Sequence, residues 1–207
     1  ESDRVWSSGV ILRQLPKRAS SWRYELGLDE YLKEKGIVAL GGVDTRRLTN
    51  LLRTKGSLSG CIIADSSATS SAMEAEAIRE AKLFPGLKGL DLARVVSQPN
   101  RNWSEASWSL DEGYRNRSEV RFKVVAYDFG IKNNILRLLA EKGCDLTIVK
   151  AQTPASEVLE LNPDGIFLSN GPGDPEPCDY AISAIKSFFE AKIPIFGICL
   201  GHQLLSI

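Results

Sequence analysis

The chain has 207 residues, which at about 150 residues per domain is more than one small domain and fewer than two full ones. Hydrophobic residues make up 43% of it and charged residues 25%, a composition that excludes a disordered or collagen-like chain. The 26 basic and 26 acidic side chains balance, so no net charge favours nucleic acid or an anionic membrane. We therefore expect no nucleic-acid and no membrane partner, and a small molecule fits better.

The first half predicts a mixed α/β domain over residues 1–97. Its predicted elements are a strand beginning at Ile37, a helix from Arg46 to Arg53, a strand over residues 61–65 and a helix from Ser71 to Lys82. Asp44 or Thr45 is the expected N-cap of the first helix, and Gly56 ends it. No catalytic motif lies in this half.

A polar, aperiodic stretch follows and predicts a linker over residues 98–120. Two tryptophans, Trp103 and Trp108, lie within it. We interpret them as residues that hold the linker against a neighbouring surface, rather than as a stacking platform for a ligand.

The second half, residues 121–207, alternates strands with helices. The predicted strands are Lys123–Asp128, Leu146–Lys150, Gly165–Ser169 and Ile193–Ile198, and the helices between them are Lys132–Lys142, Ala155–Leu161 and Asp179–Ala191. Repetition of this kind predicts an α/β fold with a doubly wound parallel sheet. Ligands bind such sheets beyond the carboxyl ends of the strands.

The last of these strands ends in a candidate nucleophile, Cys199. Gly197 and Gly201 lie two residues to either side, where a sharp turn from strand to helix needs small neighbours to expose the central side chain. The N-terminus of a helix also favours the thiolate, which is the nucleophilic form. The alternative is a buried structural cysteine between two packing glycines. The strand before Cys199 and the helix after it favour the nucleophile.

The preceding strand ends in a glycine- and proline-rich turn, residues 169–175. Taken alone, this stretch predicts only a tight turn. Beside Cys199 it suggests an oxyanion hole, in which the backbone N–H of Gly171 acts together with that of Leu200.

Other polar residues near these strand ends have plainer interpretations. The strand that ends at Asp128 and the residues after it also point polar groups at this edge of the sheet, but we favour an ordinary loop with Asn133 or Asn134 as a helix cap. His202 lies one helical turn beyond Cys199, so we interpret it as a packing or supporting residue rather than a general base.

The other three cysteines, Cys61, Cys144 and Cys178, lack both the elbow and an oxyanion turn, and we interpret them as core or surface thiols. The four cysteines form no C-x-x-C pair and the chain has one histidine, so we predict no metal site. Unpaired cysteines are typical of a reducing compartment, and no apolar run approaches the ~20 residues that span a bilayer. We expect a cytoplasmic protein.

Two motifs resemble the class I (triad) glutamine amidotransferases: Phe196-Gly-Ile-Cys-Leu-Gly-His-Gln203 and Leu168-Ser-Asn-Gly-Pro-Gly-Asp-Pro175. Three further stretches resemble the small, glutamine-hydrolysing subunits of carbamoyl-phosphate synthetase. These are Val43-Asp-Thr-Arg-Arg-Leu-Thr49, Phe84-Pro-Gly-Leu-Lys-Gly-Leu-Asp-Leu92 and Val124-Val-Ala-Tyr-Asp-Phe-Gly-Ile-Lys132. The resemblance runs across the whole chain.

The resemblance implies that Cys199 attacks the side-chain amide of glutamine while the N–H groups of Gly171 and Leu200 hold the oxyanion. It also implies that Gly171, Gly173, Leu200 and Gln203 bind glutamine. Ammonia then passes to a large partner subunit, which carries ATP and Mg and makes carbamoyl phosphate from bicarbonate for arginine and pyrimidine biosynthesis. No cofactor is expected on this chain, in which no G-x-x-x-x-G-K-[ST] motif occurs.

The resemblance also implies that the catalytic His and its orienting Glu follow residue 207, and that a further glutamine-site segment precedes residue 1. We therefore expect the chain to be truncated at both ends and the 207 residues alone to hydrolyse glutamine very poorly. Two alternatives remain: a non-catalytic glutamine-binding or scaffolding subunit, and a different class I amidotransferase. The intact elbow argues against the first, and residues 43–49 argue against the second.

Overall fold

The computed structural model describes residues 4–64 and 70–207. It divides between Gly86 and Leu87 into two compact units, one holding the described residues up to Gly86 and the other running from Leu87 to Ile207. This division precedes the boundary suggested by the sequence, because residues 87–97 pack on the second unit. Ala93, only 1% exposed, belongs to the core of that unit.

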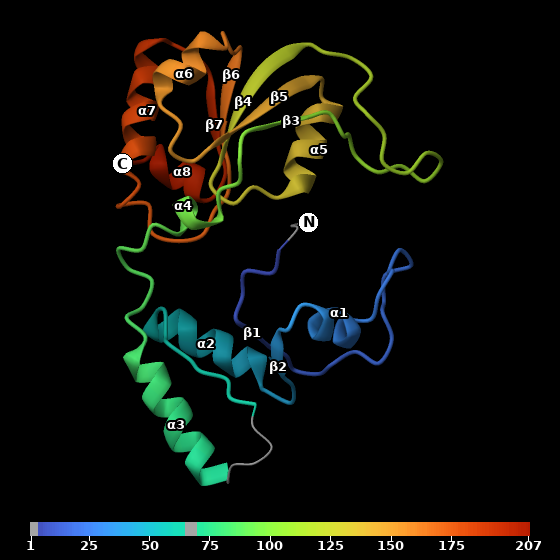
Figure 1. Cartoon of the computed structure of the whole chain (residues 1–207), viewed down its shortest axis with the longest axis vertical. Helices are drawn as coiled ribbons and strands as arrows, with labels where there is room; N and C mark the ends of the chain where they lie inside the picture. The colour runs from blue at the N-terminus through green and yellow to red at the C-terminus, as the bar shows by residue number, and fades with distance from the viewer. Residues whose placement is uncertain (1–3, 65–69) are drawn as a thin grey trace. The chain divides into compact units, whose positions relative to one another are not determined.

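The first unit is a mixed α/β unit. Its elements are β1 (Gly9–Ile11), α1 (Leu28–Glu34), β2 (Val38–Leu40), α2 (Thr45–Lys55) and α3 (Ser70–Leu83) (Figure 1). The two strands pair in parallel. The Asp44 carboxylate caps α2 by accepting a hydrogen bond of 3.0 Å from Arg47 N, and Gly56, at φ 81°, ends the helix as expected.

One predicted element of this unit is wrong. The apolar run from residue 61 was expected to be a strand to residue 65, but residues 61–64 have no regular structure, and residue 65 lies outside the described residues. No described residue pairs with this stretch in a sheet ladder. An apolar run alone does not specify a strand without a neighbour to share its hydrogen bonds.

The second unit holds a five-stranded sheet in the order β3-β5-β4-β6-β7. Its strands are β3 (Arg101–Trp103), β4 (Phe122–Asp128), β5 (Cys144–Lys150), β6 (Gly165–Leu168) and β7 (Ile195–Gly197). The last four are parallel, as predicted. β3 pairs antiparallel with β5 at one edge, which the sequence analysis did not anticipate.

Helices cover both faces of this sheet (Figure 1). The helices are α4 (Leu92–Val96), α5 (Asn133–Glu141), α6 (Ala155–Glu160), α7 (Asp179–Glu190) and α8 (Leu200–Leu204). α5 buries Leu136 and Ala140 against one face. Side chains of α6, α7 and α8 share a cluster with residues of the other face. The fold is therefore α/β with a doubly wound, mainly parallel sheet, as predicted.

Residues 98–120 do more than connect, although the sequence suggested a linker. They include β3, whose Arg101 and Trp103 pair with Ile148 and Leu146 of β5. Trp103 also donates a hydrogen bond of 2.7 Å from Nε1 to the carbonyl oxygen of Glu105. Residues 101–103 of the segment are thus an edge of the sheet, and Trp103 is one of the residues that fix the segment there.

None of the helices formed by residues 4–64 and 70–207 combines the length and the apolar character required to cross a bilayer.

Candidate active site

The turn between β7 and α8 holds Cys199 in an unusual backbone conformation. Its φ is 54° and its ψ is −112°, a region that L-residues other than glycine rarely adopt. The residue is exposed and lies two residues beyond the end of the parallel strand β7. A strained, accessible cysteine in a sharp turn from a parallel strand to a helix is the geometry of a nucleophile elbow.

The glycines on either side of Cys199 are required by close backbone packing. A Cβ added at Gly197 would lie 2.6 Å from the carbonyl carbon of Gly201. A Cβ at Gly201 would overlap the carbonyl oxygen of Leu168 in the neighbouring strand β6. Gly201 N also donates a hydrogen bond of 3.1 Å to the carbonyl oxygen of Ser169. The start of α8 is therefore held directly against the end of β6.

Gly171 lies in the loop after β6 and comes close to the beginning of α8. A Cβ added to Gly171 would lie 2.9 Å from Cδ2 of Leu200 and would overlap the carbonyl oxygen of Phe129. In the described ranges 4–64 and 70–207, the N–H groups of Gly171 and Leu200 have no hydrogen-bond acceptor. The first N–H groups of a helix lack intrahelical acceptors, so the N–H of Leu200 is available to a ligand. The structure brings together the two residues from which the sequence analysis built an oxyanion hole.

Hydrogen bonds tie the loop after β6 to the loop after β4. Phe129 N donates to Oγ of the buried Ser169 at 2.9 Å, and that hydroxyl donates to the carbonyl oxygen of Asn170 at 2.8 Å. Asn170 Nδ2 donates to the carbonyl oxygen of Gly130 at 2.9 Å, and Lys132 N donates to Asn170 Oδ1. These bonds explain why Asn170 precedes Gly171: its amide group links the two strand ends.

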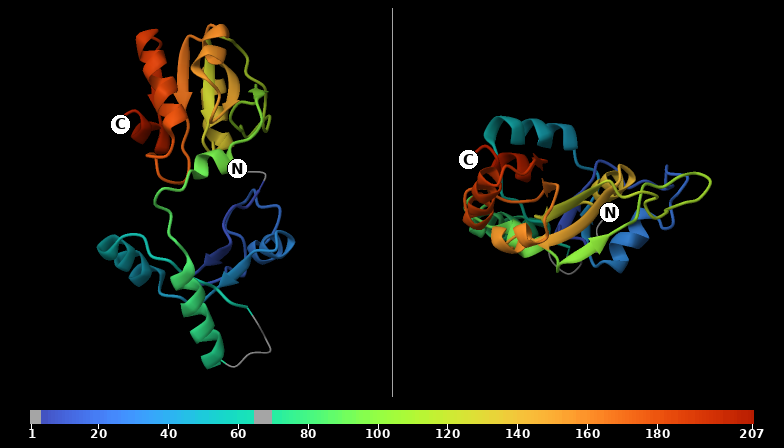
Figure 2. Two further views of the ribbon diagram at one scale, coloured as in Figure 1. Left: turned by 60° about the vertical axis from the view of Figure 1, so that its left-hand side comes forward. Right: turned by 90° about the horizontal axis from the view of Figure 1, so that it is seen from above.

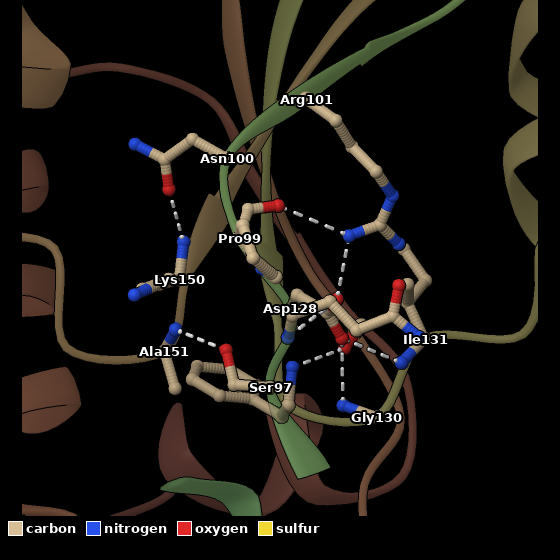
Figure 3. A network of polar contacts seen from close by, with 12 residues as sticks. Ser97, Pro99, Asn100, Arg101, Asp128, Gly130, Ile131, Lys150 and Ala151 are labelled. Atoms are coloured by element: carbon tan, nitrogen blue, oxygen red, sulfur yellow. Dashed lines mark hydrogen bonds and ion pairs between the residues drawn. The ribbon is translucent and has the colours of Figure 1, made fainter. Parts of the chain in front are cut away.

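The turn after β4 is shaped by Asp128, a carboxylate whose side chain is 2% exposed (Figure 3). Its Oδ1 accepts hydrogen bonds of 2.9 Å from both Gly130 N and Ile131 N. Its Oδ2 accepts from Arg101 at 3.1 Å, and from Gln98 N. A buried carboxylate needs such partners to offset its desolvation.

The same figure shows how residues 97–101 attach to the strand ends. Ser97 Oγ accepts a hydrogen bond of 2.9 Å from Ala151 N, and Asn100 Oδ1 accepts one of 2.9 Å from Lys150 N. From the sequence, Asp128 was expected at this edge of the sheet and was assigned to an ordinary loop, and Arg101 was not singled out. The sequence signal for Asp128 was a carboxylate at the end of a buried strand. No sequence signal identified its partner Arg101, which lies 27 residues earlier in the chain.

The remaining predicted residues lie around this centre in different ways. Gly173, at φ 97°, packs on residues 90–92: an added Cβ would lie 3.0 Å from the carbonyl oxygen of Leu90. Gln203 and His202 are both exposed on α8. His202 was interpreted as a packing or supporting residue, but its side chain is not packed in the core. Lys132, rather than Asn133 or Asn134, occupies the N-cap position of α5.

The other thiols differ from Cys199. Cys61 is exposed, whereas Cys144 and Cys178 are buried, and burial raises the pKa of both buried thiols. Within residues 4–64 and 70–207, no group of three or more His, Cys, Asp and Glu side chains is arranged to hold a metal ion.

Two family models match the chain. Residues 125–207 match the model described as "Glutamine amidotransferase class-I", and residues 1–62 match "Carbamoyl-phosphate synthase small chain, CPSase domain". The first match includes every residue of the elbow and of the loop at Gly171. Residues 63–124 lie outside both matched ranges.

Curated relatives are similar over the whole chain. The protein named carbamoyl phosphate synthase small chain is 56% identical in Pseudomonas aeruginosa and in Pectobacterium atrosepticum, each over 211 residues. In Xanthomonas campestris it is 53% identical over 208 residues. Each alignment includes 100% of this chain and 54–55% of the relative, so the chain spans about half the length of the curated relatives it matches.

Proposed function

Because the chain belongs to the family of carbamoyl phosphate synthase small chains, we propose that the protein hydrolyses glutamine with Cys199 as its nucleophile. The observation that carries this proposal is the strained, exposed Cys199 at the turn from β7 to α8. Strain of this kind persists only where the surrounding structure enforces it, and it is concentrated at functional sites. A scaffold that performed no chemistry would have no use for it.

In the proposed reaction, Cys199 Sγ forms a bond to the amide carbon of the glutamine side chain. The carbonyl oxygen becomes an oxyanion, which the N–H groups of Gly171 and Leu200 stabilise. One such donor contributes about 3 kcal/mol of transition-state stabilisation in acyl-transfer enzymes. The C–N bond then breaks, the nitrogen takes up a proton and leaves as ammonia, and a glutamyl thioester remains. Water adds to the thioester carbon, releasing glutamate and restoring the thiol.

The substrate would be held by residues around the same turn. We assign binding of the glutamine to Gly171, Gly173, Leu200 and Gln203. Gly173 and Gln203 are exposed, and Gly171 and Leu200 carry the two backbone N–H groups described above. Gly197 and Gly201 serve the geometry of the turn rather than the substrate.

The thiol proton needs an acceptor during attack. In the described ranges, no residue forms a hydrogen bond with Cys199 Sγ, and His202 is directed to solvent. We therefore propose that a base outside these 207 residues completes the site, and that the 207 residues alone hydrolyse glutamine poorly.

The names of the relatives support a role within a larger synthase. We propose that ammonia released at Cys199 passes to a large partner subunit, which binds ATP and Mg and makes carbamoyl phosphate from bicarbonate. The product would serve arginine and pyrimidine biosynthesis, and the assembly would be cytoplasmic. No cofactor is assigned to this chain.

The decisive experiment is Cys199→Ser in the full-length protein with its partner subunit. We expect glutamine-dependent synthesis of carbamoyl phosphate to fall more than about 1,000-fold, while synthesis from added ammonia stays unchanged. Retained glutamine hydrolysis in this variant would exclude Cys199 as the nucleophile. Wild-type protein that binds glutamine without releasing ammonia would instead support the scaffolding alternative.

A further inference from the structure

The loop that carries Gly171 and Gly173 continues to α7, and its second half is held by residues 89–94. We call these residues the brace. The brace follows the division between the two units and includes the start of α4, whose Ala93 is buried in the core of the second unit. Figure 2 shows α4 beneath the same end of the sheet at which α8 begins. The brace lies outside both ranges that match the family models.

The centre of the brace is the carboxylate of Asp91. Its Oδ1 accepts a hydrogen bond of 3.0 Å from Arg94 N, which caps α4. The same oxygen accepts one of 3.0 Å from the hydroxyl group of Tyr180 on α7. It also lies 3.8 Å from Sγ of the buried Cys178. One oxygen atom thus joins α4 to the end of the loop and to the first turn of α7.

A second set of contacts joins the brace to the loop itself. Gly89 N donates a hydrogen bond of 3.0 Å to Asp174 Oδ2, and Asp174 N donates to the carbonyl oxygen of Leu90. Gly173 packs so closely on Leu90 that an added Cβ would be 3.0 Å from its carbonyl oxygen. The position of Gly173 is therefore set by the brace. The position of Gly171 is set separately, by the loop after β4.

This separation suggests what the brace does. We propose that Asp91 and Tyr180 are positioning residues for glutamine: they fix Gly173, and with it the affinity for substrate, without touching the reacting atoms. The inference rests on the proposed function of Cys199. Because the direct contacts of Gly171 are with Phe129 and Leu200 rather than with residues 89–94, loosening the brace should weaken glutamine binding more than it slows the chemical step.

The test uses the full-length protein with its partner subunit and compares Tyr180→Phe with Tyr127→Phe. Both variants lose one tyrosine hydroxyl group that donates a hydrogen bond within the second unit, since Tyr127 donates to the carbonyl oxygen of Thr153 at 2.8 Å. Only Tyr180 belongs to the brace. We expect Tyr180→Phe to raise KM for glutamine about 3- to 10-fold, with kcat changed less than 2-fold, and Tyr127→Phe to leave KM unchanged.

Substitutions of Asp91 give a second readout. The amide oxygen in Asp91→Asn can still accept the hydrogen bonds from Arg94 N and from the Tyr180 hydroxyl group. KM for glutamine should therefore rise less in Asp91→Asn than in Asp91→Ala. The cap control is Asp44→Ala, which removes the same kind of helix cap from α2 in the other unit. It should leave KM for glutamine unchanged. Combining Asp91→Ala with Tyr180→Phe should raise KM less than the product of the two separate effects, because both remove the same hydrogen bond.

Three outcomes would overturn the inference: equal KM in Tyr180→Phe and Tyr127→Phe, a loss confined to kcat, or independent effects in the double variant. Alkylation of Cys199 by iodoacetamide should be equally fast in all of these variants, because no hydrogen bond joins residues 197–201 to Asp91 or Tyr180 among the described residues. If the Cys199→Ser variant hydrolyses glutamine at the wild-type rate, it is the proposed function that fails, and not the inference about the brace alone. The two failures are thereby distinguished.

Discussion

The carbonyl oxygen of Phe129 occupies the space that a side chain at Gly171 would need. A Cβ added at Gly171 would overlap this oxygen and would also lie 2.9 Å from Cβ of Phe129. Phe129 cannot withdraw easily, because its own N–H is bonded to the buried hydroxyl group of Ser169. The loop after β4 therefore acts as a rigid support that determines where the N–H of Gly171 points.

The first prediction concerns Gly171→Ala. The added methyl group must displace the backbone, so we expect glutamine hydrolysis to fall about 100- to 1,000-fold, the effect of losing one oxyanion donor. Gly165→Ala is the matched control: it lies in β6, and its added Cβ would meet Pro194 O at an ordinary 3.5 Å. Steady-state kinetics of the full-length complex would check both. Similar kcat values in the two variants would contradict the assignment of Gly171.

The second prediction tests backbone strain at Cys199. Replacement by glycine removes the penalty of positive φ, whereas replacement by alanine keeps it. We therefore expect Cys199→Gly to be more stable than Cys199→Ala by about 1 kcal/mol, seen as a higher melting temperature. Both variants should be inactive towards glutamine.

Cys61 provides the control for strain. Among the described residues other than glycine, positive φ occurs at Asn162, Lys192 and Cys199. At Cys61 the order should therefore reverse, because glycine has more conformational freedom than alanine in the unfolded chain. The same order at both positions would mean that the elbow stores no strain.

The third prediction concerns the buried pair of Asp128 and Arg101. Arg101→Ala leaves the carboxylate without its cation, and because the Arg101 side chain is 26% exposed, we expect a loss of about 1–3 kcal/mol in unfolding free energy. Combining it with Asp128→Asn should cost less than the sum of the single effects, since a neutral amide needs no cation.

Arg121→Ala serves as the matched control for this pair. Arg121 pairs with Glu119 at 2.8 Å, but both side chains are more than half exposed, so its removal should change stability much less than removal of Arg101. Denaturant unfolding of all variants would measure these differences. Equal losses of unfolding free energy in Arg101→Ala and Arg121→Ala would show that burial of Asp128 does not strengthen its ion pair with Arg101.

The sheet of the second unit could be predicted because its strands are continuous apolar runs separated by helical segments. The predicted β4 begins one residue late, and the predicted α5 extends one residue beyond each end of the observed helix. The juxtaposition of Cys199, Gly171 and Leu200 followed from the rule that carboxyl ends of parallel strands meet. Pairing of β6 with β7 produces it.

What the sequence could not reveal depends on tertiary contacts. β3 is the short polar stretch Arg101–Trp103, which becomes a strand only because β5 offers an edge. α1 follows Gly27, which has no side-chain oxygen to signal a cap. Gly89 and Asp174 are 85 residues apart, and no local pattern indicates that they are bonded. The predicted strand at 61–65 failed over residues 61–64 for the complementary reason, since no residue that the structure describes pairs with this apolar run.

The last prediction concerns pH and Asp174. Hydrogen bonds from the backbone N–H groups of Gly89 and then Glu176 hold the pKa of the Asp174 carboxyl below its usual range. A folded-state pKa below the unfolded value means that the carboxylate stabilises the fold above about pH 4. That contribution is lost as the pH falls through the folded-state pKa. We therefore expect Asp174→Asn to melt below the wild type at pH 7, with the difference shrinking towards pH 3. Thermal melting of both proteins between pH 7 and 3 would measure this, and a constant difference would show that the charge of Asp174 does not hold the loop.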